Sequence, residues 1–149
     1  MKNPTELTRR LIDAHVDFVL VGGFAAAAHG VTLRTRDVDR CCRFDEPNLR
    51  RIQTAVAALH PGHRSRPDLP FELTADECMR LRNLSLRTDL GPLDCLGEIL
   101  GVGGFHEVLS RSIQKRPRST LRACRCCLAG SQAGRSSVPR AGRNCGAWA

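Results

Sequence analysis

The chain has 149 residues, 42% of them hydrophobic, which is enough for one domain with a buried core and short for two. Its net charge of +8 is uneven: residues 1–117 hold 17 basic and 15 acidic residues, so basicity alone does not indicate a nucleic-acid-binding domain. Because it has no run of about 18 apolar residues and its first fifteen residues mix charged with apolar positions, we expect a cytoplasmic protein with no membrane segment.

The first half of the chain predicts two helix–strand pairs and a third helix. Asn3 and Glu6 form a capping-box pattern for a helix that begins at Pro4, with an apolar stripe of Leu7, Leu11 and Ala14. Residues 16–22 predict a buried strand, residues 24–29 a short Ala-rich helix and residues 36–44 a second strand. A longer helix is expected to begin at residues 45–47 and to end at residues 60–62.

The second half predicts a loop, a hairpin and two short helices. Residues 61–70 contain three prolines and predict a loop, and Thr74 with Glu77 forms another capping box. Residues 83–88 and 92–97 predict a hairpin around residues 89–91. The spacing of Phe105, Leu109 and Ile113 predicts one more helix. The expected fold class is therefore α/β (α+β), a small mixed sheet flanked by helices.

Residues 118–149 differ in kind from the rest. They contain six Arg, no Lys and no acidic residue, and they show neither helical nor strand periodicity. Their Cys-X-Cys-Cys spacing matches no standard zinc pattern. Three interpretations stay open: a disordered basic tail, the product of a frameshift, or a nucleic-acid-binding arm. We therefore predict a domain over residues 1–117 and a separate tail over 118–149.

The residues best suited to chemistry lie around the second strand. Gly22 and Gly23 follow the first strand and precede a helix, where glycine lets the backbone approach a phosphate. Asp37 and Asp39 stand two apart on the second strand, so both carboxylates point to one face. They are either surface charge on a solvated edge or, at the end of a central strand, a pair of ligands for Mg²⁺. A phosphate cradle beside a metal-binding carboxylate pair indicates phosphoryl or nucleotidyl transfer.

Asp94 is a candidate third carboxylate. It lies between apolar Leu93 and Cys95 on a predicted strand, and a carboxylate in such a place needs a partner. It is either a metal ligand, able also to activate an acceptor hydroxyl, or an outward-facing surface residue of the hairpin.

These motifs resemble the nucleotidyltransferase superfamily related to DNA polymerase beta. The similarity covers residues 5–116 and is strongest over 18–44, where an apolar strand, Gly22-Gly23, the Ala-rich segment ending in His29-Gly30, and Asp37-Val38-Asp39 follow in order. The small prokaryotic branch is the most similar, and it includes minimal nucleotidyltransferases and the AbiEii-like toxins of toxin–antitoxin pairs.

The resemblance implies an enzyme with two Mg²⁺ ions that moves a nucleoside monophosphate from a nucleoside triphosphate, such as ATP, to a hydroxyl. The acceptor would be RNA, such as a tRNA end, or a partner protein, with a cognate antitoxin or toxin as a further partner. Gly22 and Gly23 would bind the nucleotide, and Asp37, Asp39 and Asp94 would hold the metal ions. Arg36, which lies just before the second strand, is by its position either a further ligand of the triphosphate or a surface residue on a solvated face.

Two features depart from the family pattern. Arg40 takes a strand position that should face the packed side, and no Lys-bearing helix follows residue 117. The alternative is therefore a catalytically impaired module of the same fold, truncated or frameshifted at its C-terminus, that binds nucleotide or a partner without turnover.

Overall fold

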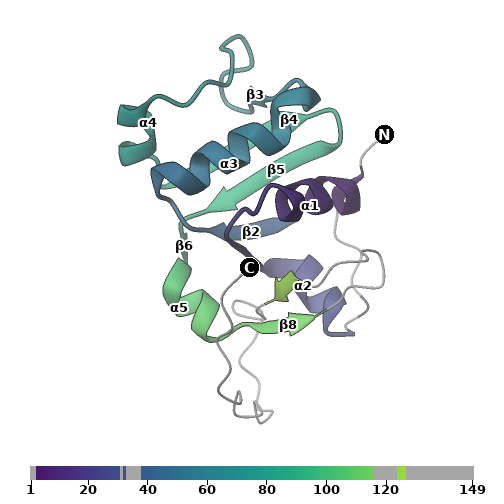
Figure 1. The fold of residues 1–149 in the computed structure, drawn as a ribbon. Coiled ribbons are helices and arrows are strands. Elements are labelled where there is room, and N and C mark those ends of the chain that lie inside the picture. Colours follow the sequence, from purple (N-terminus) through teal and green to yellow (C-terminus); the bar gives the residue numbers. More distant parts are fainter. Residues whose placement is uncertain (1–2, 31, 33–37, 116–123, 127–149) are drawn as a thin grey trace.

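The computed structural model describes residues 3–30, 32, 38–115 and 124–126, and these form a mixed α/β fold, as expected (Figure 1). Nine strands are described: β1 (Phe18–Leu20), β2 (Asp39–Cys42), β3 (Gly62–His63), β4 (Asn83–Thr88), β5 (Gly91–Leu96), β6 (Glu98–Ile99), β7 (Gly103–Gly104), β8 (Ile113–Lys115) and β9 (Cys124–Cys126). Seven of them make one sheet in the order β3-β4-β5-β2-β1-β9-β8, and β6 pairs with β7.

The two central pairings of the large sheet have opposite senses. β2 runs antiparallel to β1 but parallel to β5, whereas β4 and β5 form the predicted antiparallel hairpin. The sheet is therefore mixed, with β2 between β1 and β5 at its middle.

The α-helices of the described ranges are α1 (Pro4–Asp13), α2 (Gly22–Ala28), α3 (Glu46–Val56), α4 (Ala75–Arg80) and α5 (Phe105–Ser110). α1 and α3 lie side by side over one face of the sheet (Figure 1). Their apolar side chains, among them Leu7, Leu11 and Ile52, form the main core with Leu84, Leu93 and other strand residues. A smaller cluster on the opposite face packs Phe105 and Val108 of α5 against Val19, Val21 and Cys41.

Side-chain caps determine where three of these helices begin. Asp45 accepts a hydrogen bond from the Asn48 backbone, and Thr74 and Glu77 complete the predicted capping box. The capping box predicted for α1 is wrong in one half. Asn3 does accept from the Glu6 backbone, but its own N–H donates to the Leu90 carbonyl, and the Glu6 carboxylate instead binds two arginines.

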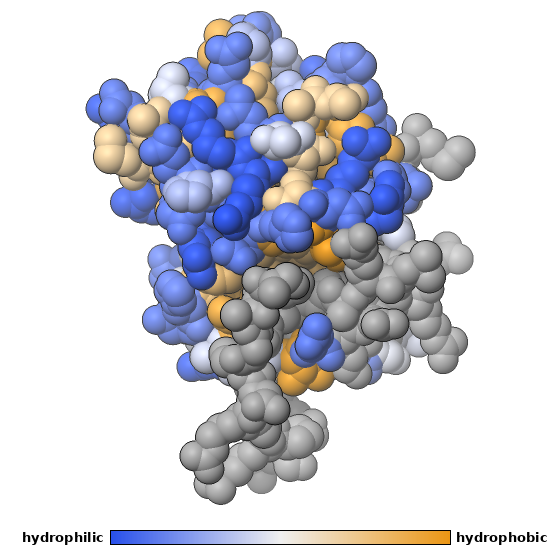
Figure 2. Space-filling view, in the orientation of Figure 1, coloured by the Kyte–Doolittle hydropathy of each residue, from blue (hydrophilic) through white to orange (hydrophobic). Residues whose placement is uncertain are grey.

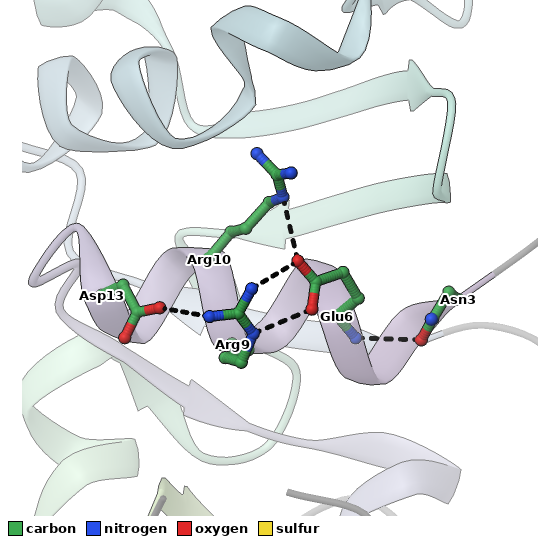
Figure 3. A network of polar contacts seen from close by, with 5 residues as sticks. All are labelled: Asn3, Glu6, Arg9, Arg10 and Asp13. Carbon is green, nitrogen blue, oxygen red and sulfur yellow. Dashed lines mark hydrogen bonds and ion pairs between the residues drawn. The ribbon is translucent and has the colours of Figure 1, made fainter.

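The exposed side of α1 carries a connected set of ion pairs (Figure 3). Glu6 bonds both Arg9 and Arg10, and Arg9 also reaches Asp13. The Arg9 guanidinium lowers the pKa of Glu6, and these pairs lie three or four residues apart, the spacing that supports a helix. Hydrophilic side chains likewise cover most of the helical face in Figure 2.

Three local predictions are wrong. Ile113 begins strand β8 instead of continuing α5, which ends at Ser110. The segment 61–70 is not all loop, because Gly62 and His63 pair with β4. α2 begins at Gly22 and not at Phe24, so the first glycine is already helical. The short β6–β7 pair was not predicted.

Arg40 is fully buried on the helix-covered face. Its guanidinium donates to the Val38 carbonyl and to the Thr8 hydroxyl, both at 2.9 Å, and its Nε has no partner among the described residues. Burial lowers its pKa. The departure noted in the sequence is therefore a buried cation held by neutral oxygens.

Two further features of the fold are the cysteines of the first 117 residues and the tail. Cys41, Cys42, Cys78 and Cys95 are buried thiols, not disulfides. Residues 124–126 form β9, whose Cys126 pairs with Leu20 of β1, and most of the tail lies outside the described residues. The division of the chain at residue 117 thus stays a prediction. Within the described ranges, no helix is long and apolar enough to cross a membrane.

Candidate functional site

Two carboxylates lie next to each other on adjacent strands at the middle of the sheet. Asp39, the first residue of β2, is paired in register with Asp94 of β5. Paired residues of neighbouring strands point to the same face, and the strands lie about 4.8 Å apart. Asp39 and Asp94 are therefore close enough to bind one cation together.

The alternation of each strand puts these carboxylates on the face that α1 and α3 leave open. In β5, Leu93 and Cys95 are buried in the main core, so Asp94 between them faces the other way. In β2, Arg40 is buried on the helix-covered face, and Asp39 before it has the opposite orientation. The apolar–acid–apolar pattern that suggested Asp94 thus marks a strand with one packed face.

Asp94 has the partners that its place on the strand requires. Nη1 of Arg64 lies 3.0 and 3.2 Å from its two carboxylate oxygens, and Oγ of Ser85 donates to one of them at 2.7 Å. The Asp94 side chain is only 15% exposed, whereas that of Arg64 is 51% exposed. Arg64, Ser85, Asp94 and Asp39 therefore form a polar row across the strands.

The sequence could have indicated Ser85 but not Arg64. Ser85 faces Asp94 in the hairpin that the sequence predicts, so register alone would have placed it there. Arg64 lies in a segment interpreted as a loop, and its position depends on the two-residue strand β3 before it and on a backbone bond to Ser85.

Gly22 borders the carboxylate of Asp39 directly. Its φ of +66° is unfavourable for other residues, and a Cβ at this position would lie 2.6 Å from Oδ2 of Asp39. Gly23 follows as the second residue of α2, and the Val21 N–H donates to the Asp39 carbonyl at 3.0 Å. The Gly-Gly turn and the carboxylate pair therefore belong to one site.

The structure does not place every predicted site residue. Asp37 and Arg36 lie outside the described residues. Among those that are described, no group of three or more His, Cys, Asp or Glu side chains could hold a metal ion. Two carboxylates nevertheless fit Mg²⁺, which typically takes one or two of them and completes its shell with water and substrate phosphates. The donor set thus suits a metal that arrives with a phosphate ligand.

The fold and this site define a mixed α/β domain with a carboxylate pair beside a glycine turn. Comparisons with protein-family models, with curated proteins and with solved structures each found no match to this chain. Any function must therefore be argued from the site.

Proposed function

We propose that the protein is a Mg²⁺-dependent nucleotidyltransferase. It would move a nucleoside monophosphate from a nucleoside triphosphate to a hydroxyl of RNA, such as a tRNA end, or of a partner protein, with a toxin–antitoxin pair as one setting. The observation that carries the proposal is the in-register pair Asp39–Asp94 next to Gly22, whose lack of a Cβ lets Oδ2 of Asp39 lie against the backbone of the turn. The sequence order of the resemblance agrees with this arrangement.

Each residue has a role in the proposed reaction. Asp39 and Asp94, together with Asp37, would hold Mg²⁺, which when bound offsets the negative charge of the phosphates. Gly22 and Gly23 would let the triphosphate approach the backbone, and Arg36 would bind its oxygens. The acceptor oxygen bonds to the α-phosphorus, the bond to pyrophosphate breaks, and the hydroxyl proton passes to a carboxylate, for which Asp94 is the candidate.

One observation favours a second candidate, a nucleotide- or partner-binding module without turnover. Both carboxylate oxygens of Asp94 already accept from Arg64, so the third acid of the proposed site is engaged by a cation of the chain itself. A site that keeps this pair permanently would bind a nucleotide without assembling the metal centre.

The experiment is calorimetry of nucleoside triphosphate binding with Mg²⁺, followed by an assay for pyrophosphate release with an RNA acceptor pool. We expect Asp39→Asn and Asp94→Asn each to reduce turnover by at least about 100-fold while thermal melts stay close to wild type. Asp89→Asn is the matched control, because Asp89 pairs with His60 on an exposed turn and should leave turnover unchanged.

The outcomes separate the candidates. Metal-dependent binding with pyrophosphate release, both lost in the two site variants, supports the transferase. Binding without release supports the module, and wild-type turnover in Asp39→Asn would refute the site.

A further inference from the structure

We infer that the ion pair between Arg64 and Asp94 breaks when a divalent cation binds. The guanidinium contacts the carboxylate in the absence of the metal ion and is displaced from it when the metal ion coordinates Asp94. This inference rests on the metal site of the proposed function and adds a residue that regulates it. It makes Arg64 a positioning residue, because it acts through Asp94.

The contacts of Arg64 are concentrated on the carboxylate. A single nitrogen, Nη1, reaches both Oδ1 and Oδ2 of Asp94, at 3.2 and 3.0 Å. Ser85 takes a further lone pair of Oδ1 at 2.7 Å. A cation that coordinates Asp94 must therefore compete with Arg64 for the same oxygens, whereas the Ser85 hydroxyl can keep the carboxylate in place.

Exposure lets the arginine leave. The Arg64 side chain is 51% exposed, so its guanidinium can move into water without becoming a buried, unpaired charge. Its backbone N–H remains bonded to the Ser85 carbonyl at 3.2 Å, so the strand contact does not depend on where the side chain lies. Asp94, only 15% exposed, stays where β5 holds it.

The charges set the direction of the effect. With Arg64 in place, the row holds two carboxylates and one guanidinium, and the guanidinium repels an arriving dication as well as occupying its ligand. Coulomb's law at about 4 Å in water predicts that removing this positive charge tightens the binding of a divalent cation by about tenfold or more. A purely structural arginine would have the opposite effect or none.

The test measures Mn²⁺ binding to the full chain without nucleotide, by the loss of the electron paramagnetic resonance signal of aqueous Mn²⁺. We expect Arg64→Gln to lower the dissociation constant by about tenfold and Arg64→Lys to stay within about threefold of wild type. Arg87→Gln is the matched control: Arg87 lies on the same exposed side of β4 as Ser85, two residues further along, and pairs in register with Pro92 and not with Asp94. It should change the constant by less than about twofold.

Asp39→Asn and Asp94→Asn, with thermal melts of every variant, make the result decisive. If the two Asp variants weaken Mn²⁺ binding but Arg64→Gln does not tighten it, the displacement is refuted and the metal site stands. Equal effects of Arg64→Gln and Arg87→Gln refute it as well, because the effect would then be general charge. If neither Asp variant changes the dissociation constant of Mn²⁺, both the metal site and the role of Arg64 are refuted.

Discussion

Replacing Arg40 by methionine should stabilise the protein, although it removes two hydrogen bonds. The guanidinium is fully buried and donates to two neutral oxygens, while its Nε lacks a partner among the described residues. A buried polar group without a hydrogen bond costs about 1–3 kcal/mol, and the loss of hydration of the buried charge outweighs its attraction to Asp39 and Asp94. Thr8 keeps a partner after the substitution, because its hydroxyl also bonds the Pro4 carbonyl at 2.8 Å.

The lowered pKa of Arg40 also indicates that its charge destabilises the folded protein. Burial lowers this pKa, so the folded protein binds this proton less tightly than the unfolded chain does. Stability is therefore reduced at every pH below the folded pKa and rises with pH only between the folded pKa and the ordinary pKa of an arginine. At neutral pH the whole cost is present, and an uncharged side chain of similar length removes it.

Similar replacements of buried ion pairs by apolar residues are neutral or stabilising by about 1–4 kcal/mol, and we expect about 1–2 kcal/mol for Arg40→Met. Urea unfolding followed by circular dichroism measures the change in the free energy of unfolding. A thermal melt of the same variant should show a Tm that is higher by about 4 °C per kcal/mol. Arg40→Ala is the control, since it removes the charge but leaves a cavity, and it should be about 2–4 kcal/mol less stable than Arg40→Met. A loss of more than about 1 kcal/mol in Arg40→Met would refute the reasoning.

Two further predictions concern the glycine turn and the cap of α4. Gly22→Ala should abolish metal and nucleotide binding, because its Cβ would lie 2.6 Å from Oδ2 of Asp39. Gly101→Ala is the control: Gly101 also has a positive φ, but a Cβ there would have nothing within 4 Å. This variant should lose only the backbone cost of about 1 kcal/mol and should bind metal and nucleotide normally. Glu77 accepts from the Thr74 backbone, which lowers its pKa from 4.5, so its contribution to stability is present above pH 4.5 and is lost as the pH falls through the folded value. Glu77→Gln should thus flatten the fall in urea stability between pH 5 and about 3, and an unchanged slope would contradict the assignment.

The sequence predicts an element well where one local signal determines it. The capping box at Thr74 and Glu77 and the alternation of residues 83–88 and 92–97 are complete within a few residues, and α4, β4 and β5 follow them. Ile113 is different, because its spacing from Phe105 suits a helix but its pairing with Cys126 makes it a strand. That pairing joins residues thirteen apart, which a short pattern does not encode.

The residues of the candidate site also differ in whether a local pattern predicts them. Asp94 was found because alternation within one strand separates a packed face from an open one, and Gly22 because its neighbours form a strand and a helix. Arg64 was missed because its partner lies thirty residues away and β3 contains only two residues. A contact that depends on the register between distant segments can be identified only once the structure is known.

The position of the carboxylates on the open face of the sheet depends on how the same strand packs on the opposite face. In β2, residue 39 faces the site and residue 40 lies in the core, so the direction of Asp39 is fixed by how firmly Arg40 is packed. A slip of one residue would bury the carboxylate and expose the arginine, and would separate Asp39 from both Asp94 and Gly22. Burial of position 40, by arginine or by methionine, therefore keeps the register that brings the two carboxylates together, and the hydrogen bond from Arg40 to Thr8 joins β2 to α1.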